Sequence, residues 1–143
     1  MSSHNTVVPE VLKTAGRQLF NGHTSDAAGE IGVEPAKSNV LYILVLVTMG
    51  NAADLVLTVK TADDAAGTNA TALTENVPLF VNDVKQTAAK THTVTAATGS
   101  FEVVFCVPTI IVPADKFIEL EFPISNAANV VSAIVLEDTY YNG

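Results

Sequence analysis

Residues 116–122 read Lys-Phe-Ile-Glu-Leu-Glu-Phe, the cleanest alternation of apolar and polar side chains in the chain. Successive side chains of a β-strand point to opposite faces. The alternating Ile, Leu and Phe are therefore expected on a buried face, and Glu119 and Glu121 are expected in water. This pattern predicts a half-buried strand and makes β-structure the starting hypothesis for the whole chain.

The segments before and after this stretch favour the same hypothesis. Residues 40–47 are apolar at every position, which is typical of a central strand, and residues 54–60 alternate between apolar and polar. Residues 49–52, Met-Gly-Asn-Ala, lie between these two segments and are typical of a hairpin connection. Further strands are expected at residues 77–81, 91–96, 101–107, 109–112 and 129–137.

Three segments have other expected structures. Residues 9–20 place apolar side chains at roughly helical spacing, but Gly16 weakens a helix, so a strand is the alternative there. Residues 83–90 are expected to form one or two helical turns. Residues 21–32 contain Asn21-Gly22 and two further glycines, and are expected to be loop.

The residue content fits an all-β protein. The chain has 20 Val, 16 Thr and no Trp, and β-branched residues pack well on pleated sheets. No long amphipathic helix bridges two predicted strands, which disfavours a parallel sheet. We therefore predict an antiparallel β-sandwich or jelly roll of about eight strands, or a compact barrel. Residues 1–20 are expected to form an N-terminal arm or short helix, and residues 21–143 a single β-sandwich domain.

Charge and hydropathy exclude several classes of partner. The chain of 143 residues is 48% hydrophobic and 15% charged, with a formal net charge of -8. Binding to nucleic acid or to an anionic membrane needs clustered Lys and Arg, so neither is an expected partner. The single cysteine excludes an internal disulfide framework. The first residues lack the features of a secretory signal, so synthesis in a cytoplasm is expected.

Few residues suggest a catalytic or metal-binding site. His4, His23 and His92 lie in different segments, without the spacing that zinc sites favour. Cys106 lies within an apolar run, where a cysteine is usually packing. Asp63-Asp64 with Asn69 form an oxygen-rich stretch that suits calcium, although the EF-hand pattern is absent.

Glu119 and Glu121 resemble a glycosidase pair in spacing only, since two residues along a strand span about 7 Å. We expect no catalytic residue, no cofactor and no metal.

The low charge instead suits contact between protein surfaces, because the cores of interfaces are depleted in charged residues.

Three groups of residues are candidates for such contacts. An arm ahead of a β-domain commonly lies over a neighbouring subunit, a long loop is commonly functional surface, and tyrosine is favoured at interfaces. The candidates are Val7, Val8, Val11, Leu12, Leu19 and Phe20 in the arm, Asp63, Asp64 and Asn69 in the loop at residues 61–76, and Tyr140 and Tyr141 at the end of the chain.

The chain also resembles small tailed-phage virion proteins that decorate the head and have a β-sandwich or jelly-roll domain. The likeness rests on residues 40–47 and 54–60, on Thr-Ala-Asp-Asp-Ala-Ala-Gly-Thr at 61–68, and on Ile-Val-Pro-Ala-Asp-Lys-Phe-Ile-Glu-Leu at 111–120. It spans roughly residues 35–138 and carries no signature motif. The resemblance implies a non-enzymatic protein on the capsid exterior. It also implies a symmetric homo-oligomer, most often a trimer, that binds the major capsid protein.

Two other functions compete with this one. The first is a carbohydrate- or receptor-binding module of a phage tail or surface adhesin, disfavoured by the absence of Trp. The second is a small metal-dependent enzyme of the cupin type, disfavoured because the histidines are not clustered.

Overall fold

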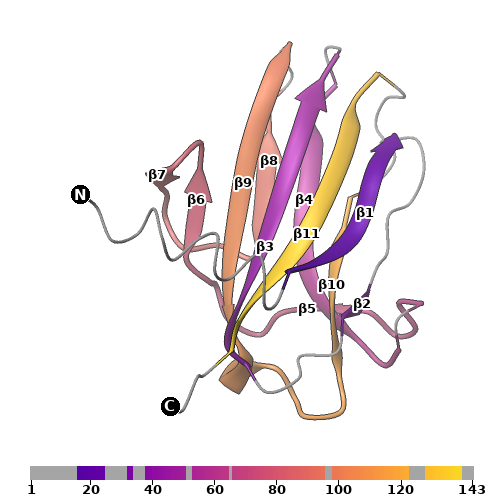
Figure 1. The fold of residues 1–143 in the computed structure, drawn as a ribbon, viewed down its shortest axis with the longest axis vertical. Coiled ribbons are helices and arrows are strands. Elements are labelled where there is room, and N and C mark those ends of the chain that lie inside the picture. The colour runs from indigo at the N-terminus through magenta and orange to yellow at the C-terminus, as the bar shows by residue number, and fades with distance from the viewer. Residues whose placement is uncertain are drawn as a thin grey trace.

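A computed structural model describes residues 16–24, 32–33, 38–50, 53–64, 66–95, 98–122 and 128–139. Two antiparallel sheets pack face to face, which confirms the predicted all-β sandwich (Figure 1). The larger sheet has the order β1 (Gly16–Thr24), β11 (Val130–Thr139), β3 (Ser38–Met49), β9 (Gly99–Pro108), β6 (Leu79–Val81), β7 (Val84–Lys85). The smaller sheet has the order β2 (Gly32–Val33), β10 (Phe117–Glu121), β4 (Leu55–Ala62), β5 (Thr71–Ala72), and β8 (Thr91–Val94) also pairs with β4.

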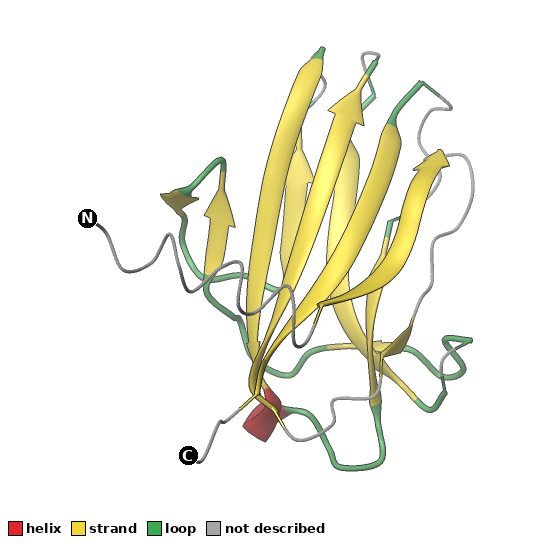
Figure 2. Cartoon of the chain, viewed as in Figure 1, coloured by secondary structure: helices red, strands yellow, loops and turns green. Residues whose placement is uncertain are grey.

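The strand count over the described residues is close to the prediction. Eight strands have three residues or more, and β2, β5 and β7 have two residues each. The single helical element in this part of the chain is the short 3-10 turn η1 (Thr109–Ile111), drawn red in Figure 2. Residues 16–20, assigned to the arm from the sequence, form the first half of β1. Residues 1–15 lie outside the described residues.

The core lies between the sheets and follows the predicted alternation. Leu55, Leu57 and Val59 of β4 are fully buried, and Ile118, Leu120 and Phe122 at β10 are at most 1% exposed. The odd-numbered residues of β3 and β9 face them from the larger sheet. The principal core residues of these two strands are Leu41, Ile43, Val45, Val47, Met49, Val103, Phe105 and Val107.

The prediction that Glu119 faces water is wrong. Its side chain is 0% exposed, and Glu121 is partly buried. β10 lies in the interior of the smaller sheet, between β2 and β4. Lys60 of β4 is opposite Glu119 and forms an ion pair with Glu121 at 2.5 Å. Alternation therefore identified the core face of this strand, but it did not identify the second face as covered.

The predicted hairpin at residues 49–52 is also wrong. β3 and β4 belong to different sheets, so their connection crosses from one sheet to the other. The fully buried Asn129 fixes both sides of this crossing. Its side-chain oxygen accepts a hydrogen bond from the Gly50 amide at 3.0 Å, and its amide donates to the Ala53 carbonyl at 3.1 Å.

Three local predictions need correction. Residues 83–90 contain no helical turn, because Asn82 and Asp83 have φ values of 47° and 65° and join β6 to β7 in a two-residue hairpin. Such left-handed pairs match the twist of the flanking strands. Residues 109–111 form η1 rather than a strand, and the Val112 amide closes the turn with a 3.0 Å bond to the Thr109 carbonyl. Within the predicted loop at residues 21–32, residues 21–24 lie in β1 and Gly32 lies in β2.

Candidate interaction site

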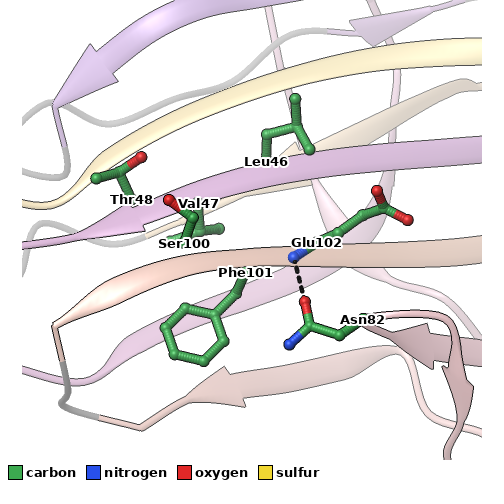
Figure 3. A pocket seen from close by; sticks show the side chains of 7 residues that line it. All are labelled: Leu46, Val47, Thr48, Asn82, Ser100, Phe101 and Glu102. Carbon is green, nitrogen blue, oxygen red and sulfur yellow. Dashed lines mark hydrogen bonds between the residues drawn. The ribbon is translucent and has the colours of Figure 1, made fainter.

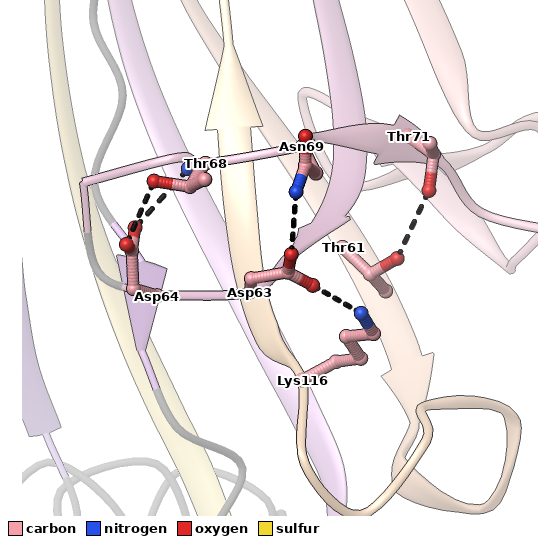
Figure 4. A network of polar contacts seen from close by, with 7 residues as sticks. All are labelled: Thr61, Asp63, Asp64, Thr68, Asn69, Thr71 and Lys116. Atoms are coloured by element: carbon pink, nitrogen blue, oxygen red, sulfur yellow. Dashed lines mark hydrogen bonds and ion pairs between the residues drawn. The ribbon is translucent and has the colours of Figure 1, made fainter.

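The predicted loop candidates are brought together, but their side chains bond within the loop and to Lys116. Asp63 and Asp64 follow β4, and Asn69 lies before β5, with Gly67 at a φ of 83° and Asn69 at 54° allowing the tight return (Figure 4). The Asp63 carboxylate accepts hydrogen bonds from the Asn69 amide at 2.7 Å and from the Lys116 ammonium. These two donors hold the pKa of Asp63 below its ordinary value, with the Lys116 contact the larger cause.

Asp64 closes the same loop from the other side. One of its carboxylate oxygens accepts hydrogen bonds from the amides of Ala66 at 2.9 Å and Thr68 at 3.1 Å. The other accepts the Thr68 hydroxyl at 2.7 Å, and these bonds to Thr68 lower the pKa of Asp64. The side chain acts as an Asx-turn acceptor that organises the backbone.

This arrangement does not favour calcium. Calcium needs six to eight oxygen ligands, whereas each carboxylate here already accepts from protein donors and the Lys116 ammonium lies against Asp63. Over the described ranges, no group of three or more His, Cys, Asp or Glu side chains is placed to hold a metal ion. The loop is a self-contained polar turn on an exposed edge.

The other predicted candidates are not assembled into a site within the described residues. Leu19 and Phe20 lie in β1, the edge strand of the larger sheet. Val7, Val8, Val11, Leu12, Tyr140 and Tyr141 lie outside the described residues, as does His4. Cys106 is partly buried on β9 and His92 partly buried on β8. Burial raises the pKa of the Cys106 thiol and lowers that of His92.

A surface that the sequence did not single out is the outer face of the larger sheet, the face turned away from the smaller sheet. The even-numbered residues of β3, β9 and β11 point to this face, and many are apolar. Antiparallel pairing aligns them in rows across the strands. The middle row is Ile134, Leu44, Val104 and Phe80; the lower row is Leu136, Tyr42 and Cys106; the upper row is Ser132, Leu46, Glu102 and Asn82.

The upper row is the most open part of this face. Leu46 is 51% exposed, although it lies in the middle of a sheet. A pocket of about 340 Å³ lies beside it, at the ends of β3 and β9, and its lining includes the core-side residues Val47 and Phe101 (Figure 3). The pocket is lined by Leu46, Val47, Thr48, Asn82, Ser100, Phe101 and Glu102.

Asn82 makes the pocket rim rigid. Its backbone amide donates to the Glu102 carbonyl at 2.8 Å, and its side-chain oxygen accepts from the Glu102 amide at 2.9 Å. The β6–β7 hairpin is therefore pinned to β9 beside the Phe101 ring. An exposed leucine next to a preformed, mostly apolar hollow is typical of a contact surface rather than of a reactive site.

The sequence carried a signal for this face. Residues 40–47 are apolar on both faces, and so are large parts of residues 101–107 and 129–137. That pattern is typical of central strands, and the strands are central. However, only one of their two faces packs on the smaller sheet, so the second apolar face is a separate feature.

No helix in the described part of the chain has the length and apolar character that a membrane span needs. Neither the models of known protein families nor the curated proteins contain a match to this chain.

Proposed function

We propose that this protein is a non-enzymatic structural subunit that associates through the Leu46 end of the larger sheet. The observation that carries the proposal is the half-exposed Leu46 beside the Phe101 pocket. An apolar side chain that is held exposed on a sheet next to an apolar hollow is typical of a protein contact surface. The resemblance to phage head-decoration proteins favours a specific role. In that role a symmetric homo-oligomer, most often a trimer, binds the major capsid protein on the capsid exterior.

The rest of the described surface supports an assembly role. The carboxylates of the 63–69 loop are engaged in their own turn. On the outer face of the smaller sheet, the Thr58 and Thr91 hydroxyls are 3.2 Å apart, and Lys60 and Glu121 are paired with each other. Few unpaired charges therefore need to be removed from water when such surfaces meet. In a symmetric oligomer each contact is repeated, so modest contacts add up to firm attachment.

The self-association is tested by light scattering after size exclusion, over a range of concentrations, for the parent chain and Leu46→Lys. Full burial of a leucine is worth about 1.5–3 kcal/mol. Since Leu46 is 51% exposed, its remaining burial is worth about 1 kcal/mol per contact. Three equivalent contacts in a trimer then lose about 3 kcal/mol, or roughly two orders of magnitude in the association constant.

Two exposed apolar residues supply matched controls. Ile110 on η1 is 91% exposed and Val84 on β7 is 61% exposed, and replacing either with lysine is expected to leave the solution mass unchanged. The proposal fails if the parent chain is monomeric at every concentration, or if Leu46→Lys keeps the parent mass. The capsid role further predicts that the chain sediments with purified phage heads and is absent from purified tails.

A second candidate function is the carbohydrate-binding module. Phe101, Asn82 and Glu102 all line the same pocket, and aromatic and polar residues together suit an oriented small ligand. An NMR titration with a panel of neutral oligosaccharides distinguishes the two functions. Chemical-shift changes centred on residues 100–102, lost in Phe101→Ala, would favour the binding module.

A further inference from the structure

The middle and lower rows of the outer face form a continuous apolar strip. Leu44 pairs with both Ile134 and Val104, and Val104 pairs with Phe80, so one row crosses four strands. The next row contains Tyr42, which pairs with Leu136 and Cys106. None of these seven side chains carries a charge at neutral pH, and all are partly buried.

The smaller sheet covers the opposite face of these strands (Figure 1). Within the part of the chain that the structure describes, no strand lies over the strip. Contiguous apolar patches on water-facing surfaces mark contact sites. We therefore expect a segment that binds over the strip to be apolar and uncharged.

The described part of β1 begins at this strip, so residues 1–15 are tethered to it through Gly16. Gly16, the first residue of β1, pairs with Leu136, so it extends the lower row by one more strand. β9 lies three strand spacings away from β1, or about 14 Å. An extended chain covers this in four or five residues at about 3.3 Å each, which brings Val11 and Leu12 over Cys106. A helix rises about 1.5 Å per residue and brings Val7 and Val8 to the same place.

We propose that residues 1–15 dock on this strip of their own chain, with Val7, Val8, Val11 and Leu12 against the lower and middle rows. The segment contains one acid, Glu10, and one base, Lys13, so it brings no net side-chain charge to an uncharged strip. Its own chain is the favoured source because a short tether gives an effective concentration in the millimolar range. The inference does not rest on the proposed function, since the Leu46 end lies outside the strip.

Cys106 makes the proposal testable, because it is the only cysteine in the chain and lies in the lower row. Val7→Cys, Val8→Cys, Val11→Cys and Leu12→Cys are each prepared in the full chain and treated with a short bismaleimide, which adds one thiol to each maleimide double bond. For at least one variant, we expect the main product to be a single chain with one bismaleimide attached. In this product both the introduced cysteine and Cys106 have reacted. The matched control Ala66→Cys lies in the loop of the other sheet and is expected to give separate adducts.

Two outcomes overturn the proposal. One is that all four variants behave like Ala66→Cys. The other is that the cross-link joins two chains, with a yield that falls on dilution. Denaturing gels and intact-mass measurements separate these cases. Neither outcome depends on the oligomer mass, so failure here is distinct from failure of the proposed function.

A second measurement does not require a cross-link. Val11→Lys/Leu12→Lys replaces two apolar residues of the segment, and Ser2→Lys/Ser3→Lys places the same charges at its start. If the segment covers the strip, the first pair raises the rate at which iodoacetamide alkylates Cys106 by on the order of tenfold, because access controls thiol reactivity. The second pair leaves the rate near that of the parent chain. Equal rates in both variants would contradict the proposal.

Discussion

Replacing Asn129 with alanine tests how the two sheets are joined. The side chain is fully buried and holds both ends of the β3–β4 crossing, through the Gly50 amide at 3.0 Å and the Ala53 carbonyl at 3.1 Å. Alanine removes both bonds. A buried group left without a partner costs about 1–3 kcal/mol. Gly50 itself is exposed, so water replaces part of the loss and the lower end of that range applies to each bond.

The expected loss is about 2 kcal/mol in the free energy of unfolding. For a chain of this size, that corresponds to a melting temperature lower by roughly 4–8 °C. Asn129→Asp keeps the acceptor for Gly50, loses the donor to Ala53 and buries a carboxylate, so its loss should exceed about 3 kcal/mol. Urea unfolding followed by circular dichroism, at one fixed protein concentration, measures both values.

Gln86→Ala is the matched control. The Gln86 side chain is exposed and donates one hydrogen bond, to the Val84 carbonyl at 3.0 Å, so the loss on its replacement should stay within about 0.5 kcal/mol. If Asn129→Ala unfolds at the same urea concentration as Gln86→Ala, Asn129 does not hold the crossing and the reasoning is refuted.

Two further predictions concern local structure. Asp83 has a φ of 65° in the β6–β7 turn, a conformation that glycine adopts without strain. Asp83→Gly should therefore raise the free energy of unfolding by up to about 1 kcal/mol, measured by urea unfolding. A loss of stability would contradict the turn assignment. The folded-state pKa values of Asp63 and Asp64 are lowered from 3.8, so the order of the 63–69 loop is fully present above that pH and is lost as the pH falls through the lower folded values. NMR from neutral to acid pH follows Asp64 through the backbone amides of Ala66 and Thr68, and Asp63 through the side-chain amide of Asn69. Lys116→Met should move the midpoint of the Asn69 signal to higher pH; an unchanged midpoint would show that Lys116 does not hold the Asp63 carboxylate.

The sequence predicted the fold class through the period-2 pattern. In β4 and β10 the pattern identified the core-facing residues, because the core face of a strand is a local property of alternation. The second face was not predictable in this way. Glu119 occupies the polar position of its strand and is nevertheless 0% exposed, because burial there depends on what else in the chain packs on that face.

Connections were the least predictable part. The Gly50-Asn51 pair suggested a hairpin, since local turn residues are the strongest short-range hairpin signal. That signal does not specify which sheet the next strand joins. The decisive residue for the crossing is Asn129, which is 79 positions from Gly50 in sequence, and no local pattern reports so distant a partner.

In the candidate site, too, the local features were predictable from the sequence and the contacts between distant segments were not. Asp63, Asp64 and Asn69 were correctly expected to be close together, because they lie within one short loop, but each finds its partners inside that loop or on Lys116. The outer face was not expected as a surface. Its rows come from β3, β9, β11 and β6, and only the sheet order and register align them.

The outer face therefore separates into two parts that can be perturbed independently. Leu46 and the Phe101 pocket lie at one end, and the strip around Tyr42 and Leu44 lies toward the end where β1 begins. If the Leu46 end serves association and the strip serves the chain's own residues 1–15, Leu46→Lys changes the solution mass and leaves Cys106 alkylation unchanged. Val11→Lys/Leu12→Lys then accelerates the alkylation and leaves the mass unchanged. A variant that changed both together would mean that residues 1–15 take part in the association, since that is the simplest contact joining the two ends of the sheet.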